Sequence, residues 1–150
     1  RVLFRSASGL GDLVVTTLSN PYMPLVRYQL GDLVQPNATP QGTLYRVHGR
    51  ARDAFRSPNH RRASVAHIDE CFQGIGGIGH YQLRQEGKDV FQLRYLLDGD
   101  GPSSAELNRL RRRLGGLLGE PSTINTVPED LFLAEASGKF RLCCPQEHPR

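Results

Sequence analysis

The feature that most constrains the fold is a change in sequence character just after Val47. The residues before it form short stretches that favour β-strands, interrupted by glycine and proline, and they show no helical pattern. The residues after it alternate strand patterns with two helical patterns over roughly 100 residues, which is enough for a core. We therefore expect the β-rich edge of a larger domain, followed by a small α+β domain.

Three strands are expected in the first part, at residues 12–18, 25–29 and 43–47, where valine, leucine, threonine and tyrosine suit a pleated surface. The second of these ends in a tight corner at Gly31 and Asp32. The segment 35–42 contains two prolines and a glycine, so we expect a loop without regular pairing there. This part is too short to enclose a core.

The second part has the alternating pattern of a mixed sheet with helices on one face. Its clearest element is a helix that begins at Ser103, where Glu106 completes a capping box, and that ends near Gly119. A leucine stripe follows this capping box at helical spacing. The other expected elements are a hairpin around 57–59, a helix over 64–72, antiparallel strands at 81–84 and 90–97, and a strand at 123–127.

Composition excludes several classes of protein. A chain of 150 residues with a net charge of +4 has the length of about one domain, and no apolar run reaches the roughly 18 residues of a membrane helix. Its three cysteines are an odd number without framework spacing, so we expect reduced thiols and a cytoplasmic protein. The adjacent pair Cys143 and Cys144 has no second pair to complete a zinc site, so no metal site is expected.

Two motifs are interpreted as structural. Residues 74–79 (GIGGIG) match a dinucleotide-binding pattern by letter, but the run follows a helix and enters a strand, the reverse of what that site requires. We expect a helix-to-strand connection. The basic run 109–113 falls mostly off the leucine stripe and has no aromatic platform, which indicates a solvated helix face rather than a nucleic-acid site.

Two residues carry possible chemistry. Asp32 follows Gly31 at a strand end, where a carboxylate with two acceptor oxygens can hold both hydroxyls of a ribose; an Asx-type turn is the structural alternative. Lys139 lies in SGKFR (137–141), where its ammonium group can reach a developing negative charge; a surface lysine is the alternative.

Four motifs occur in order along the chain, at GDLVVTTL (11–18), MPLVRYQLGDL (23–33), GRARD (49–53) and SGKFR (137–141). Together they resemble the C-terminal third of adenylate-forming enzymes of the acyl-CoA synthetase superfamily. The phenylacetate-CoA ligase and coenzyme F390 synthetase family is the most similar branch.

The resemblance implies an AMP-forming ligase that activates a small carboxylic acid with ATP and Mg²⁺ and passes the acyl group to coenzyme A. It places Asp32 at the ATP ribose, Arg50 beside it, and Lys139 at the carboxylate and α-phosphate as the catalytic residue. Arg52 occupies the hinge position. The implied domains are 1–49, the incomplete end of an N-terminal ATP-binding domain; a hinge at 50–53; and a C-terminal lid domain at 54–150.

Departures from the family pattern leave alternatives open. Arg52 stands where the family has an acidic residue or lysine, and the hairpin at 57–62 lacks the usual glycine. The chain is then either a non-catalytic interaction domain that keeps the fold, or part of an enzyme that transfers to a carrier protein or another cofactor. Because the phosphate loop and acid pocket of the family lie upstream, we expect the chain alone to be inactive. No nucleic-acid or membrane partner is indicated, and the sequence carries no sign of oligomeric state.

Overall fold

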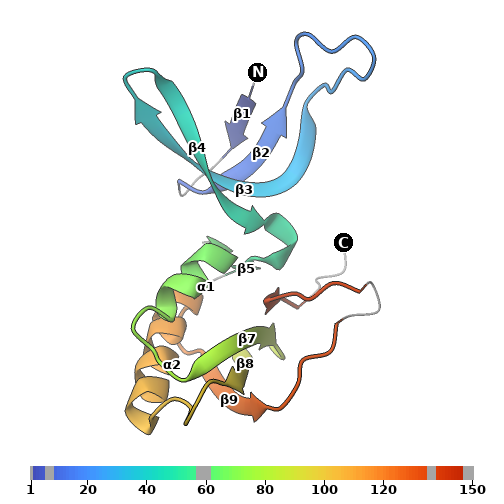
Figure 1. Ribbon diagram of the computed structural model, residues 1–150. Coiled ribbons are helices and arrows are strands. Elements are labelled where there is room, and N and C mark those ends of the chain that lie inside the picture. Colours follow the sequence, from blue (N-terminus) through green and yellow to red (C-terminus); the bar gives the residue numbers. More distant parts are fainter. Residues whose placement is uncertain (1, 6–8, 57–61, 135–137, 147–150) are drawn as a thin grey trace. The chain divides into compact units, whose positions relative to one another are not determined.

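The computed structural model describes residues 2–5, 9–56, 62–134 and 138–146 (Figure 1). The chain divides into two compact units, Arg1–Arg52 and Asp53–Arg150. We call them unit 1 and unit 2 and describe each by itself. The boundary between them lies inside the range 50–53 that the sequence assigns to a hinge.

Unit 1 is an antiparallel four-stranded sheet whose strands follow the chain order (Figure 1). The strands expected at 12–18 and 43–47 appear close to their expected places, whereas the strand expected at 25–29 begins only at Tyr28 and continues to Thr39. The strands are β1 (Val2–Arg5), β2 (Gly11–Val15), β3 (Tyr28–Thr39) and β4 (Gly42–Arg50).

The prediction of a loop at 35–42 is wrong. Strand β3 continues to Thr39, and its last residue pairs with Gly42, the first residue of β4. Strand β2 pairs with β3 only between Tyr28 and Val34, so the rest of β3 has β4 as its one partner in the described sheet. Pro36 therefore lies on an open edge, where a missing N–H breaks no ladder bond. Sequence pattern alone does not reveal which residues lie on such an edge.

The expected corner at Gly31 and Asp32 is instead an irregularity inside β3. The β2–β3 register shifts between Asp12 and Val14, so β3 carries extra residues there. Gly31 has a φ of 79°, a conformation that side-chain-bearing residues rarely adopt. The result is a β-bulge beside Asp32 rather than the end of a strand.

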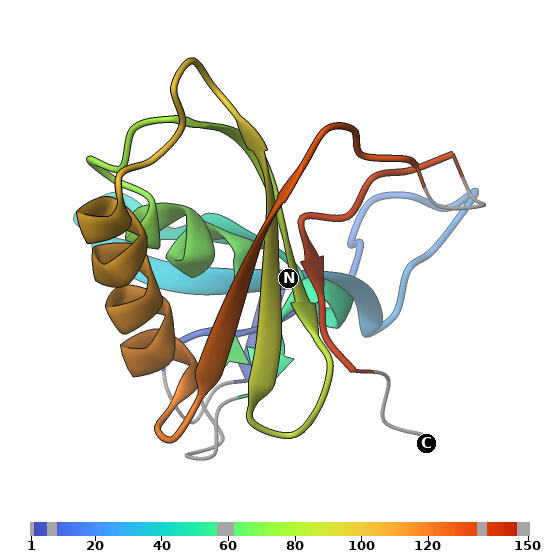
Figure 2. The same ribbon diagram turned by 90° about the horizontal axis from the view of Figure 1, so that it is seen from below.

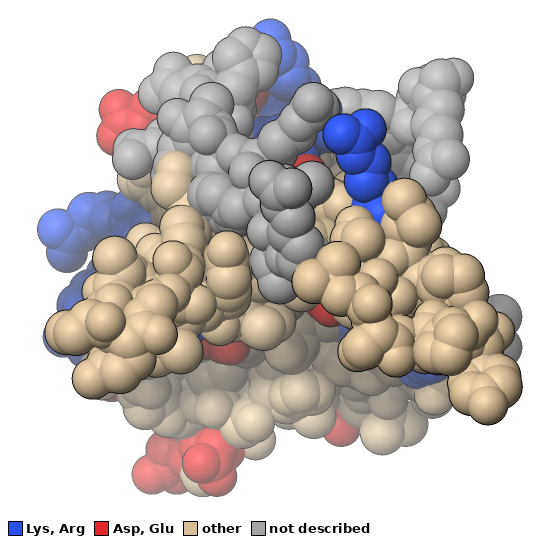
Figure 3. Space-filling view, turned by 90° about the horizontal axis from the view of Figure 1, so that it is seen from above, with Lys and Arg blue, Asp and Glu red and all other residues tan. Residues whose placement is uncertain are grey.

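The surface of unit 1 exposes many apolar side chains. Within residues 9–52, Leu33 and Val34 are the buried apolar residues. Among the described residues, those other than Lys, Arg, Asp and Glu make up most of the surface in the view of Figure 3. The large apolar residues exposed on unit 1 are Leu18, Tyr22, Met23, Val26, Tyr28, Leu30, Leu44 and Val47.

Unit 2 is built on a mixed sheet in the order β10-β7-β8-β9, with both helices on one side of it (Figure 2). Strands β7 and β8 are antiparallel, and β10 and β9 flank them in parallel pairs. This is the α+β class that the sequence predicts. Its elements are α1 (Val65–Cys71), β7 (Ile78–Gln85), β8 (Val90–Leu97), α2 (Ser104–Leu118), β9 (Thr123–Glu129) and β10 (Cys143–Cys144).

A short segment leads from unit 1 into this sheet. A 3-10 turn, η1 (Ala51–Asp53), is followed by β5 (Phe55–Arg56), which pairs with β6 (Arg62–Ala63). These strands are the arms of the expected hairpin, whose turn at 57–61 lies outside the described residues.

The core of unit 2 lies between the sheet and the two helices. Ser103 caps α2 and forms the expected capping box with Glu106, and the leucine stripe faces the sheet. The rings of Phe55 and Phe91 pack edge to face, with 5.5 Å between their centroids. Fully or almost fully buried residues include Phe55, Ile68, Leu83, Phe91, Leu93, Leu110, Leu114, Leu118 and Cys143.

The glycine-rich run 74–79 joins α1 to β7, as the sequence predicts. Gly77 has a φ of 74°, and a Cβ there would lie 2.1 Å from the carbonyl carbon of Gly101, so only glycine fits. Its neighbour Gly76 donates its N–H to the Glu106 carboxylate. The run is thus tied to the start of α2.

Two arginines of the basic run 109–113 have a structural use that the sequence did not reveal. Arg113 donates to the carbonyl oxygens of Cys71 and Gln73 at 3.0 and 2.7 Å, and Arg109 donates to that of Gly74 at 2.7 Å. These carbonyls lie at the end of α1, where a helix leaves acceptors without partners. The arginines cap that helix end.

Among the described residues, no helix has the length and apolar character needed to cross a bilayer.

Candidate functional site

Asp32 and Arg50, which the sequence assigns to one nucleotide site, lie opposite each other on β3 and β4. The Arg50 Nη1 atom is 3.2 Å from Asp32 Oδ1, and it also donates to the carbonyl oxygen of Leu30 at 3.1 Å. The Asp32 side chain is 22% exposed and that of Arg50 is 57% exposed. The guanidinium group therefore holds the carboxylate on one side, close to the surface of unit 1.

The bulge at Gly31 accounts for the position of this carboxylate. A bulge redirects a side chain at the edge of a ladder, and such irregularities are frequent next to functional sites. One carboxylate oxygen of Asp32 is engaged by Arg50, and a carboxylate has lone pairs to accept further hydroxyl groups. The carboxylate can therefore accept further hydrogen bonds while it stays paired with Arg50.

Arg52, the residue at the expected hinge position, is exposed in η1 and is the last residue of unit 1. Asp53 is the first residue of unit 2. The short 3-10 turn thus contains the point at which the chain passes from one unit to the next.

Lys139 is exposed in unit 2, in the segment that precedes β10. Gly138 beside it has a φ of 72°, which a glycine adopts without strain. Ser137, the first residue of the motif, lies outside the described residues. The structure therefore places Asp32 and Arg50 in unit 1 and Lys139 in unit 2.

An aromatic cluster that the sequence did not reveal holds the chain next to Lys139. The ring of Phe140 lies 4.8 Å from that of His80 and 5.2 Å from that of Phe132. His80 is on β7, and its neighbours Tyr81 and Leu83 face the helices. Because strand residues alternate in direction, the cluster lies on the other face of the sheet. Figure 2 shows the segment between β9 and β10 on that side.

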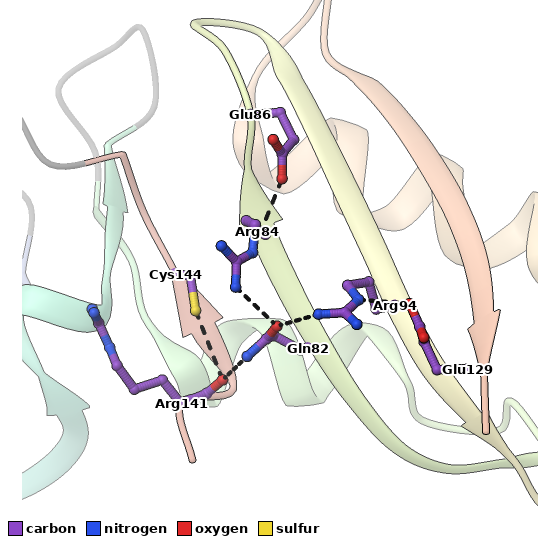
Figure 4. Close-up of polar contacts among 7 residues, drawn as sticks. All are labelled: Gln82, Arg84, Glu86, Arg94, Glu129, Arg141 and Cys144. Carbon is purple, nitrogen blue, oxygen red and sulfur yellow. Dashed lines mark hydrogen bonds and ion pairs between the residues drawn. The ribbon is translucent and has the colours of Figure 1, made fainter. Parts of the chain in front are cut away.

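A polar network continues along the same face (Figure 4). The buried Gln82 donates to the Arg141 carbonyl at 3.0 Å and accepts from Arg94 at 3.3 Å. Arg94 also bonds Glu129 at 2.7 Å, which raises the pKa of Arg94 and lowers that of Glu129. The guanidinium carbon of Arg94 lies 5.6 Å from the centroid of the Phe132 ring. The network joins β7, β8 and β9 to the segment that carries Lys139.

Arg141 connects the same segment to the start of unit 2. Its Nε and Nη2 atoms lie 2.9 and 2.8 Å from Oδ1 of Asp53, and both side chains are largely buried, at 21% and 16% exposed. Asp53 and Arg141 are 88 positions apart in the sequence. A pair so distant leaves no local pattern, which is why motif reasoning gave neither residue a role.

The thiols show no sign of a reactive site. None of the three cysteines forms a disulfide. Burial is the main cause that raises the pKa of Cys71 and of Cys143, so both are protonated at neutral pH. Burial likewise raises the pKa of Tyr81, which donates a hydrogen bond to Asp69. Within the described ranges, no three side chains of His, Cys, Asp or Glu gather in a way that could hold a metal ion.

Comparison with known proteins identifies the fold. The sequence matches no protein-family model and no curated protein. The structure is similar to that of 2-hydroxyisobutyryl-CoA ligase in the postadenylation state, in complex with 2-HIB-AMP. The TM-score is 0.62 at 21% identity, over 95% of this chain and 33% of that one.

Two further structures agree. Acetoacetyl-CoA synthetase from Streptomyces lividans gives a TM-score of 0.61 at 20% identity, over 92% of this chain and 24% of that one. O-succinylbenzoate coenzyme A synthetase from Bacillus subtilis, in complex with AMP, gives 0.60 at 15% identity, over 95% and 32%. The chain thus spans about a third or less of the ligases that it matches. Its fold is that of part of an adenylate-forming ligase, which confirms the resemblance at the level of fold.

Proposed function

We propose that this chain is the C-terminal portion of an ATP-dependent carboxylic acid-CoA ligase. The full-length enzyme forms an acyl-adenylate and pyrophosphate, then transfers the acyl group to the thiol of coenzyme A. The observation that carries the proposal is the similarity of fold to several acyl-CoA ligases over more than nine-tenths of the chain. The four sequence motifs are independent support, because they point to the same enzymes.

In this proposal unit 1 holds the nucleotide sugar. The Asp32 carboxylate accepts hydrogen bonds from the ribose hydroxyls, and Arg50 fixes its orientation through the 3.2 Å ion pair. Arg50 is itself restrained by the carbonyl of Leu30, so the pair is ordered before a ligand arrives. A preordered carboxylate binds a diol with little further loss of conformational entropy.

Lys139 supplies positive charge to the first half-reaction. Its ammonium group lies at the surface of unit 2, on a segment anchored at Phe140 and Arg141. When the acid attacks the α-phosphate, negative charge grows on the phosphate oxygens. An ammonium about 4 Å away stabilises that charge by on the order of 4 kcal/mol at an effective dielectric of about 20.

We place the hinge at 50–53, with Arg52 as its central residue, domain 1–49 before it and domain 54–150 after it. Rotation there delivers Lys139 for adenylation and removes it for acyl transfer. Mg²⁺ accompanies ATP in such a reaction, but we assign no magnesium ligand to the described residues, because they form no acidic cluster. The chain alone is inactive in this proposal, since it lacks a phosphate loop.

The substrate class is a small carboxylic acid, and the phenylacetate type is the branch we favour, on the motifs at 23–33 and 49–53. The enzyme is cytoplasmic in this proposal, which rests on the odd number of free thiols. Neither a nucleic acid nor a membrane is needed as a partner.

Exchange of labelled pyrophosphate into ATP by the full-length protein, with a panel of carboxylic acids, tests the proposal. Lys139→Ala is expected to slow exchange by at least about 100-fold, as loss of a group that stabilises the transition state does. Lys88→Ala is the matched control, because Lys88 is the one other lysine of the chain and lies exposed in the β7–β8 turn. Equal exchange rates in the two variants would contradict the role of Lys139.

The competing possibilities have distinct outcomes in the same assay. A full-length protein that exchanges no pyrophosphate with any acid is an interaction domain that keeps the fold. One that exchanges normally but releases no acyl-CoA transfers to another acceptor, such as a carrier protein. The departures at Arg52 and in the 57–62 hairpin motivate both measurements.

A further inference from the structure

We propose that Arg141 is a positioning residue for Lys139, acting through its ion pair with Asp53. The inference rests on the proposed function, because it assigns Lys139 a place in adenylation. It goes beyond that function by stating how rotation at the hinge is transmitted to the lysine.

The contact itself is well formed. Two nitrogen atoms of the Arg141 guanidinium lie within 2.9 Å of one carboxylate oxygen of Asp53. Both side chains are more buried than those of the Asp32–Arg50 pair. An ion pair with this geometry and burial holds two segments together better than an exposed pair, which solvent screens.

Each end of this contact is attached to the rigid part of unit 2. Asp53 is followed by Ala54 and Phe55, both buried, and Phe55 packs on Phe91 in the core. At the other end, the Arg141 carbonyl accepts the side-chain amide of buried Gln82 (Figure 4). The ion pair therefore joins two points that the sheet already restrains.

The position of the pair in the sequence gives it a specific consequence. Asp53 is the first residue of unit 2, directly after the proposed hinge residue Arg52. Arg141 lies two residues after Lys139. Rotation at 50–53 moves Asp53. Because Arg141 is paired with Asp53, the segment that contains Lys139 moves together with it. Phe140, packed on His80 and Phe132, restrains the intervening residue from the sheet side.

This arrangement predicts an unequal effect on the two half-reactions. Lys139 acts only in adenylation in our proposal, so misplacing it leaves acyl transfer from a ready-made acyl-adenylate to coenzyme A unaffected. The ribose site lies in unit 1, so the KM for ATP also stays the same. A displacement of about 1 Å at a reacting group costs about 100-fold in rate.

The experiment measures both half-reactions in the full-length protein with Arg141→Ala, Arg141→Lys, Asp53→Ala and the double variant. We expect Arg141→Ala to lower kcat for pyrophosphate exchange by about 100-fold, with acyl transfer retained. Arg141→Lys should recover part of that loss, and the double variant should be no slower than Arg141→Ala, because the residues act as one unit. Arg112→Ala, an exposed arginine on α2, is the control for loss of an arginine.

Equal losses in both half-reactions, or independent effects of Asp53 and Arg141, would overturn the proposal. Hydrogen exchange of backbone amides provides a readout that needs no activity. Residues 138–144 should exchange faster in Arg141→Ala, while α2 stays as in the native protein. Unchanged exchange at 138–144 refutes the role of Arg141 whatever the activity. A native protein without pyrophosphate exchange refutes the ligase proposal instead.

Discussion

Unit 1 and unit 2 differ in how each buries apolar surface. Unit 2 packs two helices on one face of a mixed sheet, and its core includes Phe91, Leu110 and Leu114. Unit 1 is a sheet of four strands, and within residues 9–52 its buried apolar residues are Leu33 and Val34. A single sheet without a covering layer does not bury enough surface to be stable alone. The difference teaches that unit 2 has the core of an independent folding unit, whereas the described part of unit 1 buries too few apolar side chains to be one.

The largest expected effect comes from separating the two units. We expect residues 53–150 alone to unfold cooperatively with temperature, because they contain the whole core cluster. Residues 1–52 alone should show no cooperative transition, since Tyr22 and Leu44 remain at 96% and 63% exposure. Circular dichroism during heating and the dispersion of amide signals in NMR spectra measure this. A cooperative transition in 1–52 would break the comparison.

Truncation of one leucine in each unit tests the comparison of the two units at single residues. Leu110→Ala should lower the free energy of unfolding of the chain by about 2–5 kcal/mol, because Leu110 is fully buried and its loss leaves a cavity. Leu44→Ala should change it by less than about 0.5 kcal/mol, because the same side chain is exposed in β4. Urea unfolding of both variants gives the two values. Similar losses would mean that unit 1 has a core of its own.

The two units also differ in how well their sequences predicted their structures. In unit 2, the capping box at Ser103 and the leucine stripe are local patterns, so the helix and the neighbouring strands were predicted near their observed bounds. In unit 1, the length of β3 depends on pairing with β4 beyond the reach of β2. Local propensity at Pro36 predicted a loop, and the sheet edge overrides it.

The residues of the candidate site also differ in whether the sequence could predict them. Asp32, Arg50 and Lys139 are predictions from short contiguous motifs, and the structure shows an ion pair between the first two. The contact between Asp53 and Arg141 spans 88 positions, and the cluster of His80, Phe132 and Phe140 spans three segments. Contacts of this kind are set by the packing of the sheet, so no spacing rule predicts them.

A smaller effect tests the arginine cap at the end of α1. Arg113→Ala should lower the free energy of unfolding of unit 2 by about 1 kcal/mol, because two carbonyls lose a charged donor at a partly solvated site. Arg112→Ala, one position away and exposed, should change it by about 0.5 kcal/mol or less. Urea unfolding distinguishes them. If the two variants are equally stable, the basic run is a solvated face throughout.

The smallest expected effect concerns the pH dependence of unit 2. The Ser103 hydroxyl, the N–H groups of Ser103 and Gly76, and nearby Arg109 lower the pKa of Glu106 from 4.5 to about 2. A carboxylate with a lowered pKa in the folded state adds stability above pH 4.5. That stability is lost as pH falls through about 2. Glu106→Gln keeps an acceptor for Ser103 but removes this titration.

The chain with Glu106→Gln should therefore be less stable than the native chain at neutral pH, and the two should converge below pH 4.5. Urea unfolding at a series of pH values from 7 to 2 measures the difference. Parallel curves over that whole range would show that Glu106 does not titrate with the folding of unit 2. All the groups that lower the pKa of Glu106 belong to unit 2. The same difference in stability should therefore appear in residues 53–150 alone, if unit 2 folds independently.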